Sequence, residues 1–295
     1  MFNGVVLVDK PAGWTSHDVV AKLRGIMRQK KIGHTGTLDP DACGVLPVCL
    51  GHATKVCELL TDKRKTYEAV LLLGRETDTQ DVSGQTLQEK EVNVTREEVE
   101  KALCNFRGEI YQLPPMYSAI KKDGVRLYEL ARQGIEIERE KRLVNISSLL
   151  LTNAEDKEYE IEVHCSKGTY IRSLISDIGE ALGTGAVMTS LRRIYANGVS
   201  IDKCYTLSAL EELNEKDELG KAVISVDDFI SYPPIRVSAP QAKRFSNGGE
   251  LDCNRFGGKK APGLYRVYSQ DDEFLGIGEI DKAVTQMSVK RVYVK

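Results

Sequence analysis

The sequence predicts an α+β protein with a mixed or antiparallel central sheet, flanking helices and a small β-rich C-terminal domain. Stretches typical of strands and helices follow one another without the regular βαβ alternation of a parallel sheet. The 295 residues are 41% hydrophobic and 28% charged, with 9 Pro and 25 Gly. That composition can form a sizeable core and excludes a disordered or collagen-like chain.

The first elements are predicted from apolar periodicity and turn residues. An apolar run over 3–9 stops at Lys10-Pro11-Ala12-Gly13, and such a stop favours a short buried strand. Residues 33–44 hold three Gly and one Pro, a pattern typical of a constrained loop. The elements expected here are a strand over 3–9, a helix capped by Thr15 or Ser16, a loop over 33–44, strands over 45–50 and 66–73, and a helix opened by Thr95.

The second half alternates in the same way and contains a domain boundary. Ser231-Tyr232-Pro233-Pro234 is typical of a linker, so we expect a catalytic domain over 1–232 and a small domain over 233–295. The elements expected are a strand over 116–121, a short helix over 127–133, strands over 143–151 and 159–165, a helix over 170–182, and Gly-punctuated strands that end near 289–294.

Charge is segregated along the chain although the formal net charge is only −2. Residues 1–35 carry six basic and two acidic side chains, and residues 235–295 carry 11 basic and 7 acidic ones. Acidic residues predominate over 76–100 and 205–231. Such a chain can present a basic face to RNA, but solvated helix faces produce the same pattern.

The cysteines and histidines favour neither disulfides nor a metal. Seven Cys is an odd number, no C-x-x-C pair occurs, and the four His form no H-x-x-x-H pair, so metal-ligand spacing is lacking. The first nine residues reach an acid without a basic flank, which is not typical of a signal peptide. No apolar run approaches a membrane span. We expect a cytoplasmic protein without membrane contact.

Asp39 is the first candidate for chemistry. It precedes Pro40, which favours extended backbone, and Gly33, Gly36 and Gly44 around it allow close approach of a bulky ligand. A carboxylate fixed there suits nucleophilic or general-base work. Taken alone, however, an Asp before Pro is more often a turn residue.

Two further segments supply partners for this acid. Tyr67 begins a strand, and Tyr170 and Arg172 stand at the start of a helix. These two residues can converge if the chain enters the helix extended, and a buried Arg beside Asp39 would stabilise its ionised form. Core packing of each Tyr and a surface position for Arg172 are the alternatives.

Six motifs in order resemble the signature of the TruB family of pseudouridine synthases. They span at least residues 3–195, about two thirds of the chain, and their order makes the resemblance specific. The motifs are Lys10–Asp18, Gly33–Pro40, Lys65–Tyr67, Leu73–Thr79, Ser166–Arg172 and Leu191–Arg193.

This resemblance implies isomerisation of uridine to pseudouridine in the T-arm loop of tRNA, at uridine-55 in tRNA numbering. The reaction requires base flipping and no cofactor, metal or energy source. The resemblance makes Asp39 the catalytic carboxylate and gives Asp41 no role. It assigns substrate binding to His34, Tyr67, Tyr170, Arg172 and Leu191, with Arg172 as the ion partner of Asp39 and Tyr67 stacked on the uracil.

The resemblance also bears on RNA binding and on partners. Lys10, Lys22, Arg192 and Arg193 are candidates for phosphate contacts, and residues 235–295 match loosely a PUA-like RNA-binding domain. We expect a monomer that binds tRNA. A guide-RNA-dependent enzyme of the dyskerin type, or a non-catalytic tRNA-binding folding factor, are the alternatives; the lack of lysine-rich tails disfavours the first.

Overall fold

The structure, a computed structural model, describes residues 1–60, 64–256, 260–283 and 285–293. Within these ranges the main feature is a ten-stranded sheet. Its strands are β1 (Gly4–Lys10), β2 (Ile32–His34), β3 (Cys43–Leu50), β4 (Arg64–Leu73), β7 (Gly108–Gln112), β10 (Arg142–Glu155), β11 (Glu158–Ser166), β12 (Ala186–Ala196), β13 (Val199–Ser200) and β14 (Val223–Ile224).

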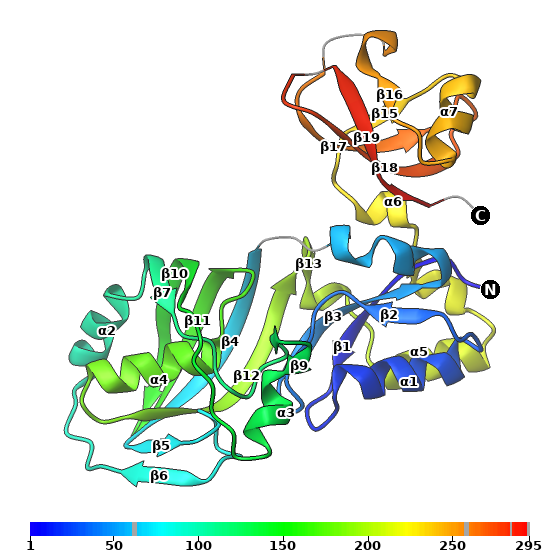
Figure 1. The fold of residues 1–295 in the computed structure, drawn as a ribbon. Coiled ribbons are helices and arrows are strands. Elements are labelled where there is room, and N and C mark those ends of the chain that lie inside the picture. Colours follow the sequence, from blue (N-terminus) through cyan, green and yellow to red (C-terminus); the bar gives the residue numbers. More distant parts are fainter. Residues whose placement is uncertain (61–63, 257–259, 284, 294–295) are drawn as a thin grey trace.

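The sheet is mixed, as the sequence predicts. Eight strands follow the order β14-β1-β3-β12-β4-β11-β10-β7, while β2 pairs with β3 and β13 with β12. Neighbours are antiparallel except β3 and β12, which run parallel. The start of β3, directly after the loop that follows β2, therefore lies beside Arg192 and Arg193 of β12, and β12 lies beside the central strand β4, although these segments are far apart in the sequence (Figure 1).

The N-terminal part of the sheet is covered on both faces. In β1, Val6 and Val8 pack under α1 (Ser16–Ile26) and α5 (Leu207–Glu215), whereas Val5 and Leu7 face a different cluster on the opposite side. A strand buried on both faces requires a continuous apolar run, which the sequence over 3–9 provides. Helix α1 begins where predicted, because Thr15 forms a capping box with Asp18.

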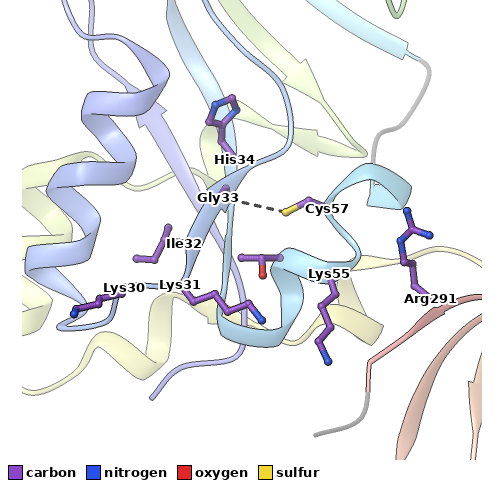
Figure 2. A pocket seen from close by; sticks show the side chains of 9 residues that line it. Lys30, Lys31, Ile32, Gly33, His34, Lys55, Cys57 and Arg291 are labelled. Atoms are coloured by element: carbon purple, nitrogen blue, oxygen red, sulfur yellow. Dashed lines mark hydrogen bonds between the residues drawn. The ribbon is translucent and has the colours of Figure 1, made fainter. Parts of the chain in front are cut away.

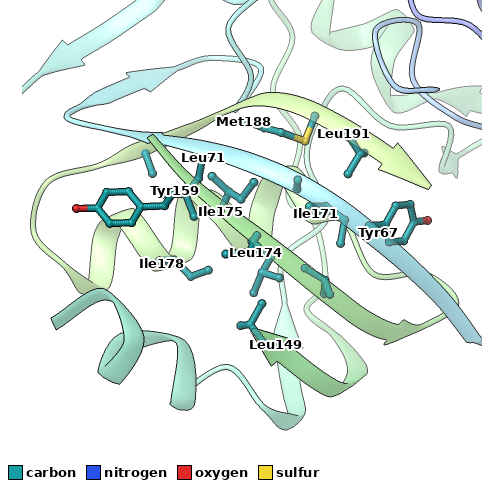
Figure 3. Packing of buried hydrophobic residues seen from close by; sticks show 14 of the residues in the cluster. Tyr67, Leu71, Leu149, Tyr159, Ile171, Leu174, Ile175, Ile178, Met188 and Leu191 are labelled. Carbon is teal, nitrogen blue, oxygen red and sulfur yellow. The ribbon is translucent and has the colours of Figure 1, made fainter. Parts of the chain in front are cut away.

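The other part of the sheet packs on one face against α2 (Arg96–Cys104) and α4 (Ile171–Ala181). Leu174, Ile175 and Ile178 of α4 lie over Leu71 and neighbouring strand residues (Figure 3). Tyr67 and Leu191 lie at the edge of this cluster, beyond its aliphatic centre. The packing of α4 thus places its N-terminus next to these two residues.

Short elements border this face of the sheet. They are β5 (Arg75–Thr77), β6 (Thr86–Glu89), β8 (Lys121–Lys122), β9 (Val125–Arg126) and α3 (Leu127–Ala131). The strand expected over 116–121 is wrong: residues 116–119 form bends, and pairing begins only at Lys121. The backbone of this segment is used at the candidate site instead.

The C-terminal residues form a second sheet. Helix α6 (Val226–Phe229) leads to β15 (Pro234–Arg236), α7 (Ala239–Ser246), β16 (Leu251–Asp252), β17 (Gly263–Tyr268), β18 (Phe274–Ile280) and β19 (Gln286–Val292). In the described ranges this sheet has five strands in the order β15-β17-β18-β19-β16. Figure 1 shows it as a β-rich lobe beyond α6. No helix of the described chain is long and apolar enough to span a bilayer.

Candidate active site

Asp39 lies in the loop of residues 35–42 between β2 and β3. The backbone N–H of Leu38 donates to Ser16 Oγ at 3.0 Å, and the N–H of Gly13 donates to the Pro40 carbonyl at 3.0 Å. Leu38 itself is buried in the core. The loop is therefore tied on both sides of Asp39, whose side chain remains 43% exposed.

Arg172 meets Asp39, as the sequence predicts. Its Nε lies 3.0 Å from Asp39 Oδ2, and its side chain is only 6% exposed. Nη1 and Nη2 donate to the carbonyls of Thr79 and Tyr117 at 2.8 and 2.7 Å. A guanidinium whose two Nη atoms are held by carbonyls presents its Nε–H to the carboxylate in one orientation.

A second acid shares this arginine. Asp81 Oδ2 lies 3.6 Å from Arg172 Nη1 and its side chain is 19% exposed. Asp81 also accepts hydrogen bonds from Thr79 and Ser83. Asp81 was not predicted as a site residue; its only signal in the sequence is its place in the acidic stretch 76–100, two residues after the motif Leu73–Thr79.

Tyr170 enters α4 in extended conformation, with φ −100° and ψ 109°. Gln112 clamps its backbone: the side-chain amide donates to the Tyr170 carbonyl at 2.9 Å, and the Tyr170 N–H donates to Gln112 Oε1 at 2.7 Å. This extended entry is the geometry in which Tyr170 and Arg172 can converge. Burial raises the pKa of the Tyr170 phenol, so the hydroxyl stays protonated at neutral pH.

Tyr67 lies on the central strand β4, with Arg193 of β12 opposite it. Burial raises the pKa of Tyr67 even though the Arg193 guanidinium hydrogen-bonds the phenol. Asp39 also acts on this phenol electrostatically, as the smallest of the contributions that shift its pKa. Leu191, 8% exposed, lies on β12 at the same end of the core (Figure 3).

His34 ends β2 and is joined edge-on to His17, with ring centroids 5.5 Å apart. Its Nδ1 is buried without a hydrogen-bond partner in the described chain. Burial, with smaller contributions from His17 and Arg193, holds the pKa of His34 below its ordinary value of 6.5. The ring is thus neutral at pH 7 and carries an unused polar atom.

A basic cavity of about 420 Å³ adjoins His34 (Figure 2). It lies apart from Asp39, between the N-terminal part of the main sheet and Arg291 of the C-terminal lobe. The residues that line it are Lys30, Lys31, Ile32, Gly33, His34, Thr54, Lys55, Cys57 and Arg291.

Two of the predicted phosphate contacts are wrong because their side chains are buried. Lys10 is 0% exposed and donates to the carbonyls of Pro11, Trp14 and Pro40. Arg193 is 1% exposed and donates to the carbonyls of Val45 and Gly36. Both cations brace the Asp39 loop from inside, a role that a sequence motif does not distinguish from phosphate binding.

The other two predicted phosphate contacts are exposed. Lys22 pairs with Glu211, and Arg192 Nη2 lies 3.0 Å from Asp9 Oδ2. Each could bind an RNA phosphate only by releasing its carboxylate partner or by contacting the phosphate and the carboxylate together. Asp41 is exposed, as expected for a residue without a role in the site.

Family models cover nearly the whole chain. The "TruB family pseudouridylate synthase (N terminal domain)" matches residues 24–171. The "tRNA pseudouridylate synthase B C-terminal domain" matches residues 172–231, and "Pseudouridine synthase II TruB, C-terminal" matches residues 233–292.

Solved structures share the fold. A Cbf5-Nop10-Gar1 complex contains a chain 27% identical to this one with a TM-score of 0.77, covering 99% of this chain and 85% of that chain. An H/ACA RNP bound to a substrate RNA containing 2′-deoxyuridine contains a chain 25% identical with a TM-score of 0.75, at the same coverage.

Relatives with similar sequences are bacterial. The tRNA pseudouridine synthase B of Citrobacter koseri is 44% identical over 290 residues, which are 95% of this chain and 91% of the relative. The protein of the same name from Escherichia coli O1:K1 / APEC is 42% identical over the same length and coverage. The chain therefore belongs to the TruB family of pseudouridylate synthases.

Proposed function

We propose that this protein isomerises uridine-55 in the T-arm loop of tRNA to pseudouridine, with Asp39 as the catalytic carboxylate. The observation that carries the proposal is the 3.0 Å contact between Asp39 and Arg172, a buried arginine beside a half-exposed acid. The names of the bacterial relatives support tRNA as the substrate.

The chemistry needs an ionised carboxylate and little else. The glycosidic C–N bond breaks, the uracil turns, a C–C bond forms through ring carbon 5, and the proton displaced from that carbon moves to the ring nitrogen. Attack on the anomeric carbon, addition to the ring and removal of the ribose 2′ proton each require Asp39 as the anion. Arg172 contacts the carboxylate through a charge-assisted hydrogen bond that fixes its orientation.

The surrounding side chains would hold a uridine that has left its stack. Flipping costs a few kcal/mol, and stacking on the Tyr67 ring returns roughly 1–3 kcal/mol. Tyr170 and Leu191 would form the remaining walls of the site that holds the uridine. The neutral His34, with its unpaired Nδ1, would contact the displaced nucleotide or fill the space that this nucleotide leaves.

Residues 233–295 would form an RNA-contacting domain, and the protein would act as a cytoplasmic monomer. The C-terminal lobe has its own hydrophobic core around Phe245 and Val267, which supports a separate unit. Analytical ultracentrifugation of the free protein tests the monomer: sedimentation as a dimer at micromolar concentration contradicts it.

The alternative is a guide-RNA-dependent enzyme of the dyskerin type; the solved neighbours belong to an H/ACA RNP bound to a substrate RNA and to a Cbf5-Nop10-Gar1 complex. Identity of 44% to a bacterial synthase, against 27% to the Cbf5 chain, favours a stand-alone enzyme. The test is a mass-spectrometric map of pseudouridine in an unmodified tRNA transcript incubated with purified protein alone. We expect one new pseudouridine, at position 55; none without added guide RNA would favour the alternative.

A further inference from the structure

Lys65 is a lysine beside the candidate site for which the mechanism has no use. It is the second residue of β4, opposite Cys165 of β11 and Ala196 of β12. Side chains two apart on a strand share a face, so Lys65 is on the face of Tyr67, about 7 Å along the strand. The ammonium therefore belongs to the same side of the sheet as the ring proposed to stack on uracil.

The surroundings of Lys65 are positive. Arg193 and Lys167 both act on its ammonium, and the only opposing group among the described residues is the Cys165 thiol. Within the described ranges the Lys65 ammonium forms no ion pair or hydrogen bond, and only the backbone of this residue is paired, with β11 and β12. Its Nζ is not one of the fully buried polar atoms that lack a hydrogen-bond partner. The aliphatic stem of Lys65 is therefore buried while its ammonium reaches solvent.

Such a lysine is costly to the folded protein. Burial, reinforced by Arg193, lowers the pKa of Lys65 to about 8. Lys10 is also buried but differs in its partners, because its ammonium donates hydrogen bonds to three carbonyls. An ammonium that lacks such partners is stabilised by an anion, and the chain supplies none at this position.

We propose that Lys65 binds a backbone phosphate of the RNA next to the flipped uridine, within a positive field to which Arg193 and Lys167 contribute. This inference rests on the proposed function. The phosphate of a nucleotide lies one sugar away from its base, and Lys65 is only two residues from Tyr67 on β4, so the ammonium is within reach of the backbone of a base stacked on that ring. Phosphate contacts fix register without reading sequence, so Lys65 would position the target nucleotide.

The protonation of Lys65 can be varied through pH because the groups that face it do not change their own charge in the same range. Burial raises the pKa of Cys165 to about 11 and also raises that of Tyr67, so both stay neutral between pH 7 and 9. Arg193 and Lys167 contribute positive charge. Among Lys65 and the groups that act on it, the Lys65 ammonium is therefore the one that loses its proton in this range.

The test compares full-length wild type with Lys65→Met, Lys65→Arg and, as a matched control, Lys157→Met. Lys157 is an exposed lysine at the hairpin between β10 and β11, about 24 Å along the strands. Equilibrium binding to an unmodified tRNA transcript is measured against salt concentration and between pH 7 and 9, together with KM and kcat for pseudouridine formation.

We expect Lys65→Met to reduce the slope of log affinity against log salt by about 0.7, the value for one single-strand phosphate. KM should rise about tenfold with kcat changed less than about threefold. Wild-type affinity should fall about fivefold from pH 7 to 9 as Lys65 deprotonates, and Lys65→Arg should keep the slope but lose this pH dependence. Lys157→Met should match wild type.

An unchanged salt slope in Lys65→Met overturns the inference, as does a Lys65→Arg variant that retains the pH dependence. These outcomes are read from binding. Failure of the proposed function would instead appear as a wild-type protein that forms no pseudouridine, so the two failures are distinguishable.

Discussion

Two buried cations hold the single carboxylate on which the site depends. Arg172 uses the carbonyls of Thr79 and Tyr117 to orient the Nε–H that meets Asp39. Lys10 binds the carbonyl of Pro40, the residue after Asp39. Asp39 is therefore held through both its side chain and its backbone, which is the preorganisation that catalysis by a charged group requires.

Two substitutions of Tyr67 test its aromatic ring and its hydroxyl separately. Tyr67→Ala should lower the single-turnover rate of pseudouridine formation by about 5- to 150-fold, because stacking on the flipped base contributes roughly 1–3 kcal/mol. Tyr67→Phe keeps the ring and should stay within about tenfold of wild type. Normal kinetics for Tyr67→Ala would mean that the uracil does not stack there.

At the scale of elements, α4 carries a half-buried acid that does not serve the site. Burial, with Glu180 nearby, raises the pKa of Asp177 from 3.8 to about 6. Because the folded-state pKa is the higher one, the stability due to its proton is complete below about pH 4 and is lost as pH rises through 6.

Asp177→Asn should therefore stabilise the protein above pH 6. The amide resembles the protonated acid and carries no charge to desolvate. The gain in free energy of unfolding over wild type should shrink as pH falls from 7.5 toward 4, measured by urea denaturation at each pH. An equal gain at pH 7.5 and pH 4 would show that the ionisation of Asp177 is not its cause.

Most elements could be predicted from the sequence where periodicity and caps agree, as in β1 and α1. Strand β12 was missed because its polar residues and the register shifts at Met188/Ser190 and Arg193/Tyr195 interrupt alternation. β7 and α5 were also missed. The Asp39–Arg172 contact was predicted from the motifs, whereas the burial of Lys10 and Arg193 depends on how distant strands pack, which local sequence does not encode.

The whole molecule is joined by one hydrophobic cluster that crosses the boundary expected at residue 232. Phe274 and Ile277 of the C-terminal sheet pack with Val5, Leu7 and other residues of the main sheet. The Phe274 ring also lies 5.1 Å from that of Tyr293 and 5.5 Å from that of Tyr268. The C-terminal lobe is thus coupled to the main sheet through core packing.

Phe274→Ala should weaken this coupling. Truncation of a buried Phe costs about 3–5 kcal/mol, and here it removes contacts between two units with separate cores. We expect thermal unfolding to split into two transitions, whereas Leu149→Ala, inside the main core, should lower one transition without splitting it. A single transition in Phe274→Ala would contradict coupling through this cluster.

The central claim is that the Asp39 carboxylate carries the reaction, and the neighbouring Asp41 provides a matched control two residues away on the exposed side of the same loop. The measurement is the single-turnover rate of pseudouridine formation at tRNA position 55, with tRNA affinity determined in parallel. Asp39→Asn should abolish turnover while affinity stays within about tenfold, and Asp41→Asn should match wild type. Turnover by Asp39→Asn near the wild-type rate would contradict the assignment.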